Sequence, residues 1–202
     1  MTTMTTALTF AATTAPEGTI DTLTLPRSFA TVIDTLLAYV STDTLRGALT
    51  GVLLECREDG AYWVATDGHA VLIVHTAALT DASGIVSGTV VLDGGSLRTW
   101  RRQQGFIRSH PDAGHFPDIR SVIPDSDRSA ASCIGISTKL LARLGTVLRK
   151  LKLLKGIGEP VVMHLGGGLA PLVFSVVMPE KNVGPVRDLS CVVMPMRLRE
   201  QS

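Results

Sequence analysis

The chain has few cysteines, few aromatic residues and no long apolar run. Its three cysteines, Cys56, Cys133 and Cys191, are far apart and lack the paired spacing of metal ligands. This pattern disfavours a disulfide framework or a zinc ribbon and predicts a reducing, cytoplasmic environment. The longest nearly unbroken apolar stretch, residues 70–79, is far shorter than the roughly 20 residues that span a bilayer, so no membrane partner is expected.

Neither sign of charge dominates, because 19 Lys and Arg residues face 18 Asp and Glu residues for a formal net charge of +1. A balanced charge predicts no strong attraction of the whole molecule to nucleic acid. Any such binding therefore has to come from a local basic surface. With 202 residues, 45% of them apolar, the chain can form one domain, or two small ones, around an ordinary core.

Hydrophobic periodicity predicts one order of elements that occurs twice. The threonine-rich residues 1–19 are expected to form a flexible arm. A strand at 22–25, a helix at 28–40 and strands at 48–56, 61–66 and 70–75 are predicted to follow. A shortened unit then consists of a strand at 88–92 and a helix at 95–104, before an irregular stretch at 105–124. The order returns with a strand at 132–136, a helix at 138–154 and strands at 160–165, 171–178 and 189–194.

This recurrence predicts an α+β protein built from β-α-β-β-β units, with antiparallel sheets on one side and helices on the other. We expect one full β-α-β-β-β unit and the shortened unit within residues 20–126, and the second full unit within residues 127–202.

Basic residues on two of the predicted helices form the first candidate site. They are Arg98, Arg101 and Arg102 on the shorter helix and Lys139, Arg143, Arg149 and Lys150 on the longer one. A lone basic helix is most often a solvated face, but two at equivalent points of a repeat favour a surface that contacts duplex DNA phosphates without reading sequence. The longer helix has a separate apolar stripe, so changing Lys139, Arg143 and Lys150 together to Glu is expected to abolish DNA binding without unfolding the protein.

No arrangement of residues indicates catalysis. The run 166–168 is three glycines without a phosphate-binding motif, which predicts a hairpin turn. Ligand-type side chains gather at His110, Asp112, His115 and Asp118, but no second cluster completes a metal site or the site of a hydrolase. We therefore predict a protein that is not an enzyme and uses no cofactor or metal.

Three segments, in order along the chain, point to a family. They are Ala65-Thr66-Asp67-Gly68-His69, the stretch from Phe116-Pro117-Asp118 to Pro124, and Val193-Met194-Pro195-Met196-Arg197-Leu198. On the recurring β-α-β-β-β pattern, residues 23–198 resemble the bacterial sliding clamp, the beta subunit of DNA polymerase III. The resemblance implies a DNA-clamp fold and a non-enzymatic processivity factor of DNA replication. It also implies a homo-oligomer that closes a ring around DNA.

The resemblance further implies a pocket for short linear peptides of DNA polymerase and other replication proteins. Carried over to this sequence, its residues are Thr66, Gly68, His69, Pro117, Val122, Val193, Met194, Pro195, Met196 and Arg197. Two positions depart from the family pattern, because Ala70 and Ser121 stand where basic residues are usual. We therefore expect a weaker preference for acidic residues beside the bound peptide anchors.

The chain is also short for this family, since it has two full units and one shortened unit where a clamp subunit has six. This predicts a truncated member of phage or mobile-element type that acts as a replication accessory factor and contacts duplex DNA non-specifically. The alternative is an adaptor or decoy that binds the same client peptides without encircling DNA.

Overall fold

The computed structural model describes residues 22–81, 84–111, 114–119, 136–151, 161–164, 171–177 and 185–193. The expected arm at 1–19, the strand at 132–135 and the glycine turn at 166–168 lie outside these residues.

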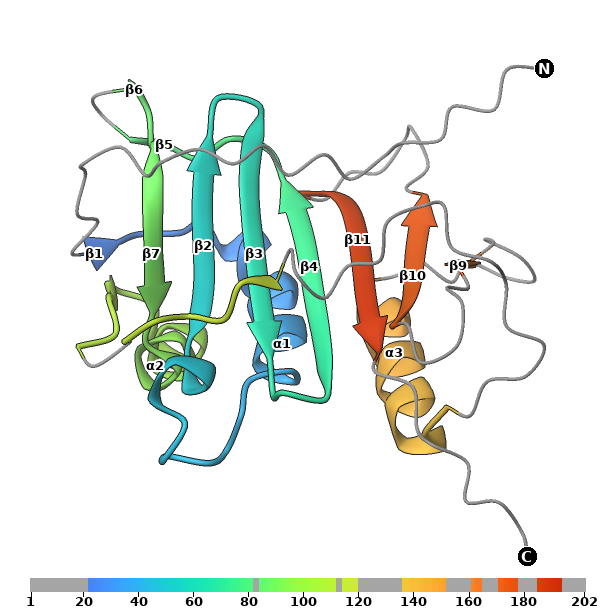
Figure 1. The fold of residues 1–202 in the computed structure, drawn as a ribbon. Coiled ribbons are helices and arrows are strands. Elements are labelled where there is room, and N and C mark those ends of the chain that lie inside the picture. The colour runs from blue at the N-terminus through green and yellow to red at the C-terminus, as the bar shows by residue number, and fades with distance from the viewer. Residues whose placement is uncertain are drawn as a thin grey trace, which may run out of the picture.

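A seven-stranded antiparallel sheet forms the centre of the protein, in the order β7-β2-β3-β4-β11-β10-β9 (Figure 1). The strands are β2 (Val52–Arg57), β3 (Gly60–Thr66), β4 (Ala70–Thr76), β7 (Gly88–Leu92), β9 (Val161–His164), β10 (Leu172–Val177) and β11 (Val186–Val193). Strands β2 to β4 occupy one half in sequence order, and β11 to β9 occupy the other in reverse. The last strands of the two predicted units, β4 and β11, therefore pair with each other where the halves meet.

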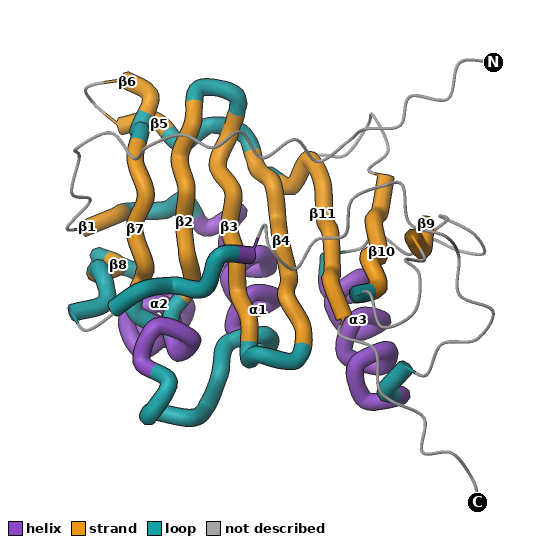
Figure 2. Tube along the Cα trace, in the orientation of Figure 1, coloured by secondary structure: helices purple, strands orange, loops and turns teal. Residues whose placement is uncertain are grey.

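The three α-helices that the structure describes lie on one side of this sheet (Figures 1 and 2). They are α1 (Ala30–Leu37), α2 (Gly94–Gln103) and α3 (Thr138–Lys150), and a 3₁₀ turn, η1 (Arg27–Phe29), leads into α1. Two short pairs complete the described elements: β1 (Thr22–Leu23) with β8 (Ile107–Arg108), and β5 (Thr80–Asp81) with β6 (Gly84–Ile85). The predicted α+β class, an antiparallel sheet with helices on one side, is confirmed.

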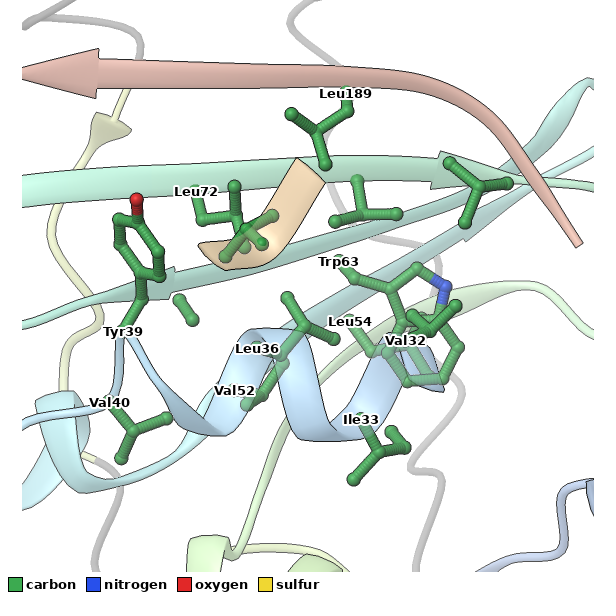
Figure 3. Packing of buried hydrophobic residues seen from close by; sticks show 14 of the residues in the cluster. Val32, Ile33, Leu36, Tyr39, Val40, Val52, Leu54, Trp63, Leu72 and Leu189 are labelled. Atoms are coloured by element: carbon green, nitrogen blue, oxygen red, sulfur yellow. The ribbon is translucent and has the colours of Figure 1, made fainter. Parts of the chain in front are cut away.

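The main core lies between the helices and the sheet, and Figure 3 shows part of it around α1. Trp63 on β3 is fully buried and its ring centroid lies 5.8 Å from that of Phe29. A smaller apolar cluster lies on the opposite face of the sheet and includes Val71 and Ile73 of β4. Strand β4 is therefore buried on both faces, which explains its unbroken apolar sequence.

Element boundaries differ from the predictions where tertiary contacts decide them. Strand β2 begins at Val52 rather than at residue 48, because Gly47–Thr50 forms a second 3₁₀ turn, η2. In that turn the Thr50 hydroxyl bonds to the Gly47 carbonyl at 2.7 Å and to His110 Nε2 at 3.1 Å. Strand β11 begins at Val186 rather than at residue 189, because it pairs along β4 as far as Thr76.

Candidate functional site

The turn between β3 and β4 is closed by its own side chains. The Thr66 hydroxyl, 3% exposed as a residue, donates to the Ala70 carbonyl at 2.9 Å and accepts from the Gly68 amide at 3.1 Å. One carboxylate oxygen of Asp67 accepts from the His69 and Ala70 amides at 2.9 and 3.1 Å. Gly68 has a φ of +88°, in the left-handed region that favours glycine. The turn therefore has a defined shape and presents Gly68 and His69 at the surface.

Strand pairing brings the end of β11 to this turn. Val193 lies directly opposite Ala70 in the β11–β4 register, so the predicted site residues Thr66, Gly68, His69 and Val193 share one end of the sheet. The further predicted residues Val122, Met194, Pro195, Met196 and Arg197 lie outside the described part of the chain.

Two neighbours of the turn were not among the predicted site residues. A Cβ built on Gly68 would lie 2.8 Å from Arg46 Nη1 and 3.9 Å from Leu49 Cδ1. Arg46 also pairs with Asp43 at 3.5 Å, with its side chain about half exposed. The site thus has a cation and an apolar side chain beside the glycine. In the sequence, only the position of Arg46 and Leu49 shortly before β2 could have indicated that they lie near the turn.

The segment that contains Pro117 lies against the sheet face opposite the helices (Figure 1). Phe116 is 9% exposed and belongs to the apolar cluster that includes Val71 and Val192, while Pro117 is exposed. Val71 and Val192 directly adjoin the paired residues Ala70 and Val193. Phe116 therefore joins the segment to an apolar cluster that includes residues of β4 and β11, the strands that carry the turn and Val193.

Helix α3 reaches the turn through Arg143. Its Nη1 donates to Asp67 Oδ2 at 2.8 Å, and its guanidinium carbon lies 4.1 Å from the centre of the Tyr39 ring. The Tyr39 hydroxyl is in turn 3.5 Å from Cys191 Sγ in β11. Arg143 is thus held within the protein by Asp67 and Tyr39 and is not a free cation of the helix surface. That the fold tolerates its replacement stays a prediction.

Burial and hydrogen bonding shift the pKa values of this cluster. Burial alone would raise the pKa of Asp67, but hydrogen bonds from Arg143 and the two turn amides outweigh it, so the pKa lies below its usual value. Burial raises the pKa of Tyr39 far above its usual value and that of Cys191 to about 11. At neutral pH the cluster therefore contains an ion pair, a neutral phenol and a neutral thiol.

The other basic residues of the predicted DNA surface are exposed on the helical side of the sheet (Figure 2). They are Arg98, Arg101 and Arg102 on α2 and Lys139, Arg149 and Lys150 on α3. Helix α1 contacts both of these helices. Its Asp34 accepts from Arg101 Nε at 2.9 Å, which offsets one of the positive charges.

Within the described ranges, no group of three or more His, Cys, Asp or Glu side chains is placed to hold a metal ion. Among the helices described, none is both long and apolar enough to traverse a bilayer.

No protein-family model matches the sequence, and no curated protein is similar to it. Solved structures are similar in fold. A DNA polymerase sliding clamp from Pseudomonas aeruginosa, solved with a ligand, has a TM-score of 0.59 at 17% identity, and the match covers 91% of this chain and 68% of the clamp chain. The same kind of clamp bound to griselimycin has a TM-score of 0.57 at 16% identity, over 92% and 68% of the two chains.

The H. pylori beta clamp in complex with diflunisal has a TM-score of 0.60 at 10% identity, and the match covers 88% of this chain and 66% of the clamp chain. This chain therefore has the α+β DNA-clamp fold, over about two thirds of the length of these clamp chains.

Proposed function

We propose that this protein is a non-catalytic, sliding-clamp-like accessory factor of DNA replication, reduced in size as in phage or mobile elements and acting in the cytoplasm. It binds short peptide segments of DNA polymerase or other replication proteins and contacts duplex DNA without sequence preference. The observation that carries the proposal is the register of β11 on β4. It places Val193 opposite Ala70, so segments far apart in sequence meet at one surface of a DNA-clamp fold.

The chemistry of this surface suits a peptide with one or two large apolar anchors. Gly68 has no side chain to keep a peptide away from the turn, and Leu49 is its apolar neighbour. Val193, which is itself buried, brings the end of β11 beside the turn. Anchors of this kind supply most of the energy of a peptide complex. Arg46 adds a positive charge beside Gly68, so we propose that it attracts an acidic flank despite the neutral residues at positions 70 and 121.

Fluorescence polarisation with a labelled clamp-binding peptide of a bacterial DNA polymerase III tests this site. Met194 and Met196 directly follow the end of β11, so Met194→Ala and Met196→Ala should each weaken binding about fivefold or more. Met163→Ala is the matched control, because Met163 is 45% exposed on β9, two strands away from β11. Unchanged affinity in both site variants would place the peptide elsewhere.

The DNA contact is proposed for the exposed basic residues of α2 and α3. Such binding should be weak, indifferent to sequence and steeply dependent on salt. Changing Lys139, Arg149 and Lys150 together to Glu leaves the Arg143 ion pair in place and should lower the log–log salt slope by about 2 to 3 if each residue neutralises one phosphate. A charge-matched control compares Arg149→Glu with Arg187→Glu. Arg187 lies on β11, where its side chain donates to the backbone carbonyl of Asp59, away from the basic residues of α2 and α3.

The second candidate is an adaptor or decoy that binds the same peptides without encircling DNA. The observation in its favour is that the matches to clamp structures cover only 66–68% of those chains. A ring requires a closed homo-oligomer, whereas an adaptor can act as a single chain. A monomeric mass in solution, peptide binding and no DNA binding at low salt would together favour the adaptor.

A further inference from the structure

Asp67 uses its two carboxylate oxygens for different partners. Oδ1 accepts from the amides of His69 and Ala70 and so holds the shape of the turn. Oδ2 receives the hydrogen bond from Arg143 Nη1. The side chains of Arg143 and Asp67 are 23% and 21% exposed, so solvent and salt screen this pair less than a surface pair. The orientation of the carboxylate is thus defined from both sides.

The guanidinium of Arg143 is itself fixed by Tyr39. That ring is 1% exposed, lies just after the end of α1 and is tied through its hydroxyl to Cys191 in β11. The cluster therefore joins α3, the chain after α1, β11 and the β3–β4 turn. Partly buried ion pairs add little net stability because desolvation opposes their attraction, but they favour one arrangement of the groups around them.

We infer that Arg143 is a positioning residue for the peptide site, holding the Asp67 carboxylate in the orientation that shapes the turn at residues 66–70. For peptide binding this inference rests on the proposed function; for the turn it stands alone. Without the guanidinium, a half-buried carboxylate loses its cation and gains by rotating toward water or taking up a proton. Either change weakens its hydrogen bonds to the His69 and Ala70 amides. Within the part of the chain that the structure describes, the charged groups Arg46 and its partner Asp43 and the titratable side chain of His69 also lie near the turn.

Arg143→Met tests the inference, because it keeps much of the aliphatic length and removes the charge. Two readouts are followed: the amide resonances of His69 and Ala70 during an acid titration, and affinity for the labelled polymerase peptide. The resonances of both amides report on the protonation of Asp67, so we expect the pH at the midpoint of their change to rise. We also expect peptide affinity to fall about tenfold. Arg143→Lys should restore part of both effects, and Arg187→Met, at an exposed position of β11 near Asp59, should change neither.

A double-mutant cycle separates positioning from a general loss of stability. Asp67→Asn keeps an oxygen that can accept from the turn amides but removes the charge that Arg143 neutralises. In that background Arg143→Met should alter peptide affinity by less than about twofold, since the partner is already gone. An equal loss in both backgrounds would overturn the inference.

The two proposals fail in different ways. If the His69 and Ala70 amide resonances of the Arg143→Met variant change at the same pH as in wild type, the positioning role is overturned, whatever the peptide affinity of the variant. If these amides shift but wild type does not bind the peptide, positioning of the turn is supported and the proposed peptide site fails. Should Arg143→Met not fold, Arg143→Lys carries the same comparison of amide titrations, and Asp67→Asn, which has no carboxyl group, shows which amide shifts report on Asp67.

Discussion

Replacing Thr66 by Val removes the hydroxyl that closes the β3–β4 turn and keeps nearly the same shape. The hydroxyl makes two hydrogen bonds, one to the Ala70 carbonyl and one from the Gly68 amide. Each such bond contributes about 1 kcal/mol net, so we expect Thr66→Val to lower the free energy of unfolding by about 2 kcal/mol. The Gly68 amide is at the surface and can bond to water, which keeps the cost from rising further.

Thr76→Val is the matched control, because Thr76 ends the neighbouring strand β4 at the opposite end of the β3–β4 hairpin. Thr76 is fully buried, accepts from Trp63 Nε1 at 3.1 Å and donates to the Ala77 carbonyl at 3.1 Å, with the Ala61 carbonyl a further acceptor at 3.4 Å. Because Thr76→Val leaves the buried Trp63 N–H without this acceptor, we expect a loss of about 2 kcal/mol or more. Urea unfolding measures both losses, and fluorescence polarisation at low temperature measures peptide affinity while both variants are folded.

Only Thr66→Val should weaken peptide binding, because only Thr66 belongs to the turn. Equal peptide affinity in the two variants would refute the place of the turn in the site. A Thr66→Val protein as stable as wild type would refute the hydrogen-bonding account of the turn itself.

The remaining predictions concern packing, conformation and acid dependence. Gly60→Ala should destabilise by about 2 kcal/mol or more in thermal unfolding, because a Cβ there would clash with the His75 ring and the Thr76 carbonyl oxygen. Gly145→Ala should stabilise by up to about 1 kcal/mol, since the helical position has open space around it. Cys191 should resist thiol reagents in the native state at neutral pH, as its pKa is about 11. The pKa of Asp67 is lower in the folded protein than the ordinary value of 3.8, so the ionised carboxylate stabilises the fold fully above pH 3.8. This stabilisation is lost as the pH falls through the lowered pKa of the folded state. Asp67→Asn should therefore reduce the acid dependence of the free energy of unfolding measured with urea.

Much of the fold could be predicted from periodicity, because strands and helices bury faces at fixed intervals. The strand at β7 and the turn at Gly68 follow from local sequence alone. Boundaries set by a partner could not be predicted. Strand β11 extends to Val186 because β4 lies beside it, and no local pattern within β11 reports the length of its neighbour.

The candidate site was predictable only in part. The residues of the turn carry a recognisable motif, whereas Arg143 meets Asp67 across 76 positions of sequence. Helical periodicity places Arg143 on the flank of the apolar stripe but does not say which side chain lies opposite. For the same reason Leu49 was missed, since its contact with the turn depends on the η2 turn that replaces the expected start of β2.

The central claim is that the turn at residues 66–70 and the end of β11 form one peptide-binding surface. Titrating the isotopically labelled protein with the polymerase peptide, and following every backbone amide by NMR, tests it most directly. The account predicts that the largest shifts fall on Gly68, His69, Ala70 and Val193, with little change on α1 and β9. Shifts confined to other parts of the chain, or none at saturating peptide, would contradict it.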